Sequence, residues 1–326
     1  MARAQLNHND MKGPHMNKNL KINGNSIHTL DLNFMGMAGT IAAYLIPHKH
    51  GAILIESGPG TTLDILEESL KPYGYELDDI SDILLTHIHL DHAGAAGALS
   101  RLGAKVYVHH VGFPHLLNPD KLLASAARIY GEMMDQLWGE MFPVESDRLI
   151  SLQDGDVVEI EGLFFHALDT PGHANHHLAY SFQDICFSGD IGGVRLYGLD
   201  HLRLPMPPPE LHLMKWRESL NRLATEEFSF IAPTHFGIYN DVDLHLSNLS
   251  KNIDITEQWI KKIMGNQPTP EELNIEFFNW INEQSQKDSL SQHQIEAFET
   301  ANPLWMSSLG IYRYWHKHLA NQENMV

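Results

Sequence analysis

Short runs of hydrophobic residues, separated by glycine or basic residues, mark the first part of the chain. Segments 28–34, 40–46 and 51–56 are runs of this kind and predict three short strands. Segment 61–74 follows a glycine–proline break, and its leucines repeat at helical spacing behind a threonine, which predicts a helix. A buried strand over 82–87, a helix of small residues and a further strand come next. This alternation is typical of an α/β core.

The pattern changes twice further along the chain. Residues 111–147 are rich in methionine and helix-forming residues, and they interrupt the strands. Strands resume at 156–170, which has a glycine-centred turn, and at 177–190, which predicts a hairpin. A last strand is expected at 228–235, and the chain beyond it shows only helical periodicity. The pattern therefore predicts a core of strands and helices with a helical insertion and a helical tail.

Composition and charge exclude several classes of partner. The chain has 41 acidic residues against 22 Lys and Arg, and the formal charge of −19 repels phosphate backbones, so no nucleic-acid partner is expected. The N-terminal segment has no apolar signal-peptide region, and no apolar run reaches the roughly 18 residues that cross a bilayer, so no membrane partner is expected either. A single cysteine, Cys186, forms no internal disulfide, which favours a cytoplasmic location.

The candidate chemistry begins in a cluster of metal-ligand residue types, His87-x-His89-x-Asp91-His92. It follows a buried apolar strand and precedes a helix, so its side chains are expected at the carboxyl end of a strand, where α/β sheets place their sites. A polar loop with satisfied histidines is the ordinary alternative. Four such residues in six positions, in a chain with 22 histidines, favour a metal site.

Three more candidate ligands, His173, Asp190 and His235, each follow directly after an apolar segment. Any one of them alone is more often a cap or turn residue. Together with the first cluster they make the order H-x-H-x-D-H, then His, then Ser-Gly-Asp, then Pro-Thr-His. Over roughly residues 28–240 this order resembles the metallo-β-lactamase superfamily.

The resemblance implies an α+β fold, a four-layer αβ/βα sandwich with metals at one edge between two sheets. It implies that one metal is bound by His87, His89 and His173, that a second is bound by Asp91, His92 and His235, and that Asp190 bridges both. Together with the pattern along the chain, this predicts a flexible segment 1–22, a metallo-β-lactamase-like catalytic domain 23–241 containing the insertion 111–147, and a helical extension 242–326. We expect the insertion and the extension to cover the pocket.

The chemistry of the ligands agrees with a catalytic site. Imidazole and carboxylate suit two divalent ions, with Zn²⁺ the first choice and Fe or Mn as alternatives. A structural zinc site is closed, whereas seven ligands shared by two metals leave positions open. Two metals lower the pKa of a bridging water to roughly 7, and the hydroxide attacks an ester, thioester or lactone carbonyl. Asp91 and Asp190 serve this step, and Tyr197 is a candidate donor to the developing oxyanion, with loop packing as its alternative.

Several positions near the motifs carry a weaker signal. The superfamily usually has an aspartate in the strand before the first helix, and Glu56 stands there, so we expect Glu56 to support the metal loop with one extra methylene. Either His176 or His177 is a candidate to point into the pocket. Four residues of the insertion are candidates for an apolar wall or for the core: Met133, Met134, Trp138 and Met141.

Comparison within the superfamily points to a hydrolase near the glyoxalase II branch. Diiron oxygen reductases have a glutamate where His89 stands, nucleases carry a cap domain with further histidines, and true β-lactamases are usually secreted. The alternatives are a mononuclear-iron persulfide dioxygenase and a non-catalytic metal-binding protein. The expected partner is a small-molecule substrate, and a homodimer is compatible with the sequence.

Overall fold

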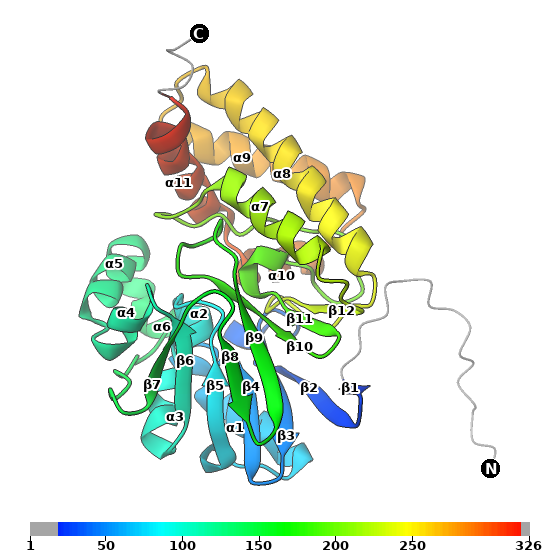
Figure 1. The fold of residues 1–326 in the computed structure, drawn as a ribbon. Helices are drawn as coiled ribbons and strands as arrows, with labels where there is room; N and C mark the ends of the chain where they lie inside the picture. The colour runs from blue at the N-terminus through cyan, green and yellow to red at the C-terminus, as the bar shows by residue number, and fades with distance from the viewer. Residues whose placement is uncertain (1–18, 321–326) are drawn as a thin grey trace, which may run out of the picture.

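The computed structural model describes residues 19–320, and two β-sheets face each other at its centre (Figure 1). The first sheet has the strand order β1-β2-β3-β4-β5-β6-β7. Its strands are β1 (Asn19–Ile22), β2 (Asn25–Asp31), β3 (Ala42–His48), β4 (Gly51–Ile55), β5 (Ile80–Leu84), β6 (Lys105–His109) and β7 (Leu149–Leu152). Neighbours are antiparallel from β1 to β4 and parallel from β4 to β7.

The second sheet has the order β12-β11-β10-β9-β8. Its strands are β8 (Val157–Ile160), β9 (Leu163–Asp169), β10 (Leu178–Phe182), β11 (Ile185–Phe187) and β12 (Phe230–Ala232). The two hairpins expected in 156–170 and 177–190 are confirmed as β8–β9 and β10–β11. Glu161 and Gly162 both have positive φ in the first turn, which suits the twist of a tight hairpin.

Both faces of the first sheet are buried, and the alternation along β3 shows how. Tyr44 and Ile46 belong to the core between the two sheets, together with Phe165 of β9 and Phe187 of β11. The intervening Leu45 belongs to a separate core under the helices outside the sheet. Since successive side chains of a strand point to opposite faces, a strand that is apolar throughout must lie between two layers.

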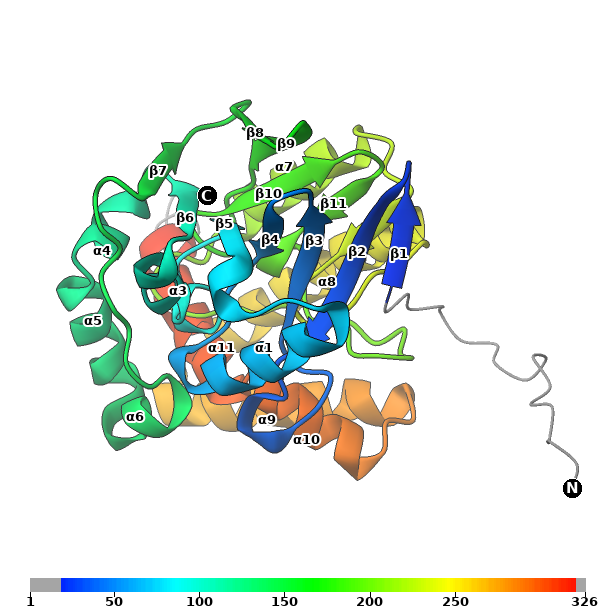
Figure 2. The same ribbon diagram turned by 90° about the horizontal axis from the view of Figure 1, so that it is seen from below.

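Helices form the two outer layers. Figure 2 shows α1 (Leu63–Leu70) and α3 (Ala96–Leu102) across the outer face of the first sheet. On the second sheet, α7 (Leu213–Ala224) and α8 (Val242–Met264) bury their apolar sides in a third core. The α+β four-layer sandwich implied by the resemblance is confirmed.

Helices also fill the insertion and the tail. The insertion contains α4 (Phe113–Leu117), α5 (Asp120–Tyr130) and α6 (Met134–Leu137), and after Leu137 it is irregular up to β7. The tail continues with α9 (Pro270–Lys287), α10 (Gln292–Ala301), α11 (Leu304–Tyr314) and a π-helical turn, Trp315–Leu319. Capping boxes begin α9 and α10, with Thr269 and Ser291 as the capping residues.

Two boundaries differ from the sequence-based expectation. The strand expected at 28–34 is β2 and ends at Asp31, because Asn33 has a left-handed backbone and the Asp31 carboxylate accepts hydrogen bonds from the N–H groups of Asn33 and Gly39. Residues 19–22, expected to be flexible, form β1 and pair with β2; the rest of that prediction lies outside the described residues. Within residues 19–320 no helix is long and apolar enough to span a membrane.

Candidate active site

The seven predicted ligands lie in four connections that follow strands. The loop after β5 carries His87 and His89, and the short helix α2 (Leu90–Ala93) carries Asp91 and His92. The other three follow β9, β11 and β12, and these are His173, Asp190 and His235. Strand ends from both sheets meet at one edge of the sandwich, and this brings together side chains up to 148 positions apart.

The first three histidines converge on one point. The Nε2 atoms of His87 and His173 are each 2.9 Å from the Nδ1 atom of His89. The ligand atoms of these three side chains lie within 4.8 Å of one another. Such spacing between ring nitrogens fits a shared metal ion, since imidazole nitrogens bind zinc at about 2.0–2.1 Å.

A second group forms beside the first. The Oδ2 atom of Asp91 is 3.3 Å from His235 Nε2 and 3.5 Å from His92 Nε2. The ligand atoms of these three residues also lie within 4.8 Å of one another. The two groups match the two triads that the resemblance implies.

Asp190 lies between the two groups and presents one oxygen to each. Its Oδ1 atom is 3.2 Å from His92 Nε2 and 3.4 Å from His235 Nε2, on the side of the second group. Its Oδ2 atom is 3.3 Å from His173 Nε2, on the side of the first group. This is the placement expected of a carboxylate that bridges two metal ions.

The buried polar atoms of the site indicate that it fits metal ions. His92 Nε2 and Asp190 Oδ1 face each other at 3.2 Å, yet neither has a hydrogen bond with any group in residues 19–320. Buried polar atoms normally have a partner, and orphaned ones need an explanation such as an ion. A set of imidazole and carboxylate ligands suits Zn²⁺, Fe or Mn, so the residues present fit the metals implied by the family.

Hydrogen bonds to the outer ring nitrogens orient the histidines. His173 Nδ1 donates to the carbonyl of Pro205 at 2.8 Å, and His235 Nδ1 donates to the carbonyl of Thr40 at 2.7 Å. A carbonyl only accepts, so each ring carries a proton on Nδ1 and directs Nε2, the atom that can bind a metal, toward the centre. Such outer contacts fix the tautomer of metal-binding histidines.

Glu56 supports the loop from behind, as expected. Its fully buried carboxylate is 3.0 Å from His92 Nδ1, and it accepts hydrogen bonds from the Thr86 N–H, the Thr86 hydroxyl and the Thr234 hydroxyl. The Thr86 hydroxyl is in turn 3.0 Å from His87 Nδ1. Glu56 has a left-handed backbone, with φ of 67°, and we infer that this conformation accommodates the additional methylene.

The protonation of the site follows from burial and from its mixture of charges. Burial, followed by the neighbouring imidazoles, holds the pKa of His87 well below its usual value and keeps this ring neutral. Burial also opposes a charge on His92, but Asp91, Asp190 and Glu56 together raise its pKa well above the usual value. Burial raises the pKa of Asp190, yet the adjacent histidines, His92 first, lower it overall. The carboxylates are therefore ionised and ready to balance a cation.

The site forms the floor of a pocket of about 660 Å³. Its floor is made by His89, Asp91, His173, Asp190 and His235. The walls come from helices α5 and α6, from the segment Pro207–Glu210, and from the end of α10 and the start of α11 within residues 299–306. The expectation that the insertion and the tail cover the pocket is confirmed.

The weaker candidates divide between pocket and core. His176 lines the pocket, whereas His177 is buried with its Nδ1 atom 2.8 Å from the Thr170 hydroxyl. Burial lowers the pKa of His176 to about 4, so this ring is neutral. Of the apolar candidates, Met133 and Trp138 line the pocket; the others, Met134 and Met141, pack in the core under the first sheet.

The expected role of Tyr197 is wrong. Its side chain is 55% exposed and is not among the pocket-lining residues. The chain leaves the site after Gly193, because Val194 pairs with Arg203 and His235, and Leu196 is buried instead of its neighbour. Tyr197 is therefore a surface residue of a loop.

A tyrosine that the sequence did not single out lines the pocket instead. Tyr130, at the end of α5, donates a hydrogen bond to the sulfur of Met306 at 3.1 Å. Burial raises the pKa of Tyr130, and the charge of Asp91 raises it further, which shows that the two groups share one environment. Nothing in the helical pattern around residue 130 distinguishes this tyrosine from a core residue.

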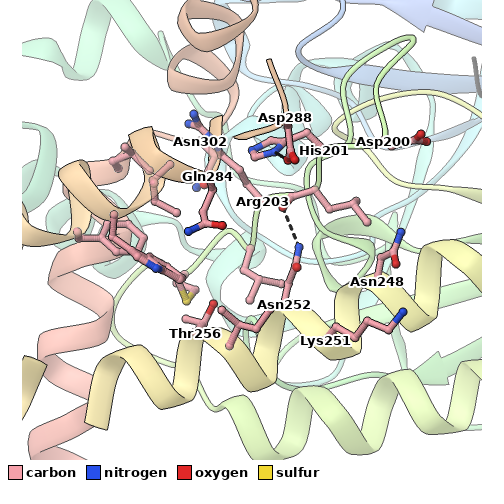
Figure 3. A pocket seen from close by; sticks show the side chains of 18 residues that line it. Asp200, His201, Arg203, Asn248, Lys251, Asn252, Thr256, Gln284, Asp288 and Asn302 are labelled. Atoms are coloured by element: carbon pink, nitrogen blue, oxygen red, sulfur yellow. Dashed lines mark hydrogen bonds and ion pairs between the residues drawn. The ribbon is translucent and has the colours of Figure 1, made fainter. Parts of the chain in front are cut away.

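A second, smaller pocket of about 260 Å³ lies behind the loop Asp200–Met206 (Figure 3). It is bounded by α8 and α9, and Asn302 lines both pockets. The Asp288 carboxylate lies 2.6 Å from His201 Nδ1. Figure 3 shows these two side chains next to each other. The same stretch of chain supplies the carbonyl of Pro205 that orients His173, so this loop separates the two pockets and positions one ligand.

Comparison with known proteins gives the family. A sequence model of the metallo-beta-lactamase superfamily matches residues 36–235. A metallo-beta-lactamase fold-containing protein of Sulfurisphaera tokodaii is 29% identical over 224 residues, which is 65% of this chain and 82% of that protein. A hydroxyacylglutathione hydrolase of Aeromonas hydrophila is 32% identical over 147 residues, which is 45% of this chain and 44% of that protein's length.

A solved structure supports the fold along most of the chain. A metallo-beta-lactamase family protein of Thermus thermophilus superposes with a TM-score of 0.66 at 20% identity and covers 89% of this chain and 93% of its own. The site and these matches together define a metal-dependent hydrolase. The chain belongs to the metallo-beta-lactamase superfamily.

Proposed function

We propose that the protein hydrolyses a carbonyl-centred bond, an ester, thioester or lactone, with water activated at two metal ions. The observation that supports this most directly is Asp190, which presents one oxygen to each of two ligand triads on the floor of an open pocket. When bound there, such ions lower the pKa of water to roughly 7 and polarise a carbonyl oxygen. Zinc is the first choice for both positions, with iron or manganese as alternatives.

The chain's own residues hold and orient this site. The triad His87, His89 and His173 holds one position, and the triad Asp91, His92 and His235 holds the other. Asp190 sets the distance between them. Burial keeps His87 and His89 neutral, as metal ligands need to be. The neighbouring carboxylates raise the pKa of His92 and of His235, so metal binding releases protons from these two rings.

A protein nucleophile is not part of the proposal. The only cysteine, Cys186, is fully buried in β11, and burial raises the pKa of its thiol, so it is an inert thiol. Asp91 and Asp190 are left as the groups beside the reacting water. The name of the Aeromonas relative, a hydroxyacylglutathione hydrolase, makes an acyl thioester the first substrate to test. A cytoplasmic location and a homodimer stay predictions.

The experiment combines metal analysis with a substrate panel. We expect close to two transition-metal ions per chain after reconstitution, and turnover of at least one thioester, ester or lactone that a chelator abolishes. No bound metal after reconstitution contradicts the proposal and favours a non-catalytic protein or a different site. One iron per chain, with oxygen consumption on glutathione persulfide and no hydrolysis, supports a persulfide dioxygenase instead.

A further inference from the structure

Helix α5 presents two adjacent stripes of side chains to the pocket. An apolar stripe is formed by residues 122, 126 and 129, and a polar stripe by residues 121, 125 and 128. Both repeat at i, i+4 and i+7, the spacing that places residues on one side of a helix. The polar stripe contains Lys121 and Arg128, which lie two turns apart, about 10 Å along the axis.

Neither Lys121 nor Arg128 has an ion pair with any group in residues 19–320. The four acidic residues of the same pocket have other partners. Asp91 and Asp190 face the histidines of the floor. Glu210 accepts a hydrogen bond from the Asn175 N–H at 2.8 Å, and Glu299 pairs with Arg203 at 2.6 Å. In a chain with a formal charge of −19, two unpaired cations facing one pocket are a specific feature.

The remaining wall of the pocket is aromatic. The ring of Trp138 lies 5.6 Å from that of Phe34 and 5.1 Å from that of Tyr130. Tyr130 also contacts Trp305 of the tail at 5.8 Å. A pocket of about 660 Å³ with such walls is in the range of small-ligand sites, which bury apolar groups against aromatic side chains.

We propose that the substrate joins an apolar acyl group to a negatively charged leaving group, and this inference rests on the proposed hydrolase function. The acyl group lies against the aromatic wall, and the scissile carbonyl reaches the floor. The charged leaving group lies along Lys121 and Arg128, which are exposed, so its anion stays partly hydrated and avoids the cost of full burial.

The reaction is a balanced hydrolysis. The oxygen of water bonds to the acyl carbon, and the bond between that carbon and the sulfur or oxygen of the leaving group breaks. One proton of the water goes to the leaving thiolate or alkoxide, and the other is released as the carboxylic acid ionises. The cations act on binding of the leaving group, and take no part in proton transfer.

The test compares two thioesters that share one acyl group. Hexanoyl-coenzyme A has a polyanionic leaving group, and S-hexanoyl-N-acetylcysteamine has a neutral one. We expect kcat/KM at low ionic strength to favour the anionic thioester by on the order of tenfold or more. This preference should shrink at 1 M salt, where the Debye length is about 3 Å.

Matched variants test whether Lys121 and Arg128 cause the preference for the anionic thioester. The double variant Lys121→Gln, Arg128→Gln should bring the ratio of the two kcat/KM values close to one. The control Lys105→Gln, Lys262→Gln removes the same charge from exposed lysines outside the pocket and should leave the ratio unchanged. Lys121→Arg keeps the charge and should keep the preference.

The outcomes separate this inference from the proposed function. Equal turnover of both thioesters overturns the inference and leaves the hydrolase standing. Faster turnover of S-glutaryl-N-acetylcysteamine than of the hexanoyl form overturns it too, because the charge would then belong to the acyl side. If neither is hydrolysed, calorimetric binding of the thioether S-hexyl-coenzyme A decides: loss of binding in the double variant supports the inference, and unchanged binding contradicts it.

Discussion

Asp190 and Glu56 are two buried carboxylates with different functions in one site. Asp190 faces two histidine groups, and its Oδ1 atom has no hydrogen bond within residues 19–320. Glu56 instead contacts His92 and accepts hydrogen bonds from Thr86 and Thr234, which lie in two of the loops that carry the ligands. Buried charges are costly unless they are paired or bind metals. Glu56 meets that condition with hydrogen bonds from protein groups, and Asp190 meets it fully only when a cation is present.

Asp190→Asn therefore tests the site at the scale of one residue. Asparagine keeps the shape and removes the charge, so we expect the metal content to fall toward one ion per chain and kcat/KM to fall by orders of magnitude. The melting temperature of the metal-free protein should change little, because the sandwich core is made of apolar side chains. Elemental analysis, thermal unfolding and turnover on one preparation measure all three.

The matched control for this variant is Asp184→Asn. Asp184 is exposed in the turn of the same β10–β11 hairpin, away from the ligands, and the chemical change is identical. We expect this control to keep its metals and its turnover. An Asp190→Asn protein that also keeps two metals and full activity would show that Asp190 is an ordinary turn residue.

At the scale of elements, the insertion and the tail meet over the pocket. Tyr130, at the end of α5, contacts both Trp305 and Met306 at the start of α11, although 175 positions of sequence separate Tyr130 from Trp305. The two helical segments thus form one wall although they are far apart in the sequence. Under the proposed function, we expect this wall, more than the metal floor, to determine which acyl group fits.

Trp305→Ala should consequently change substrate binding more than chemistry. Loss of one aromatic contact costs about 0.5–1.5 kcal/mol, so we expect KM for a hexanoyl thioester to rise by about two- to twelvefold with little change in kcat. Steady-state kinetics measure the split. Phe278→Ala removes an exposed aromatic residue of α9 outside the pocket and should leave KM unaffected. A fall in kcat alone would place Trp305 in the chemical step.

At the scale of the whole molecule, the helical extension is tied to the turn that carries Asp190. His245 of α8 donates from Nε2 to the carbonyl of Gly192 at 2.8 Å, and its Nδ1 atom accepts from Arg195 at 3.2 Å. Asp241, which precedes α8, holds both terminal nitrogens of Arg195 at 2.7 Å. Helix α8 is therefore part of the support of the site, although no ligand lies on it.

The buried His245 makes stability depend on pH. Burial lowers its pKa to about 4, below the ordinary value of 6.5, so the folded state favours the neutral ring. Its contribution to stability is complete above pH 6.5 and is lost as the pH falls from 6.5 to 4. The groups that face it are Arg195, Asp241 and Tyr239, and the cation Arg195 adds to the cost of protonation.

His245→Gln should weaken that dependence, because glutamine keeps polar contacts and does not titrate. With a chelator present throughout, we expect the loss of unfolding free energy between pH 7 and pH 5 to be smaller in the variant than in the parent. Urea unfolding at both pH values gives this difference. An identical loss in both proteins would show that His245 does not contribute to the pH dependence.

The local pattern determined most of the secondary structure and all seven candidate ligands. A hydrophobic pattern with a period of two residues indicates a strand with one buried face, and a period of 3.6 indicates a helix with one buried face. The hairpins β8–β9 and β10–β11 and the helix α7 are examples. The motif order was enough to expect two triads and a bridging Asp190. The sequence-based predictions that were wrong concern irregular parts of the chain: the end of the strand before Asn33 and the role of Tyr197. In such parts, the direction of the chain depends on tertiary contacts.

Only the tertiary structure decided which distant side chains share the pocket. The contact of Tyr130 with Trp305, the position of His176 rather than His177 in the lining, and the unpaired state of Lys121 and Arg128 depend on how helices pack against the sandwich. The hydrophobic pattern does not predict these contacts, because a helix has the same pattern of apolar residues whether that side packs in a core or lines a cavity. By itself the sequence determined the set of candidate metal ligands, since residue types and their spacing are local, whereas the wall of the pocket is assembled from segments that only the fold brings together.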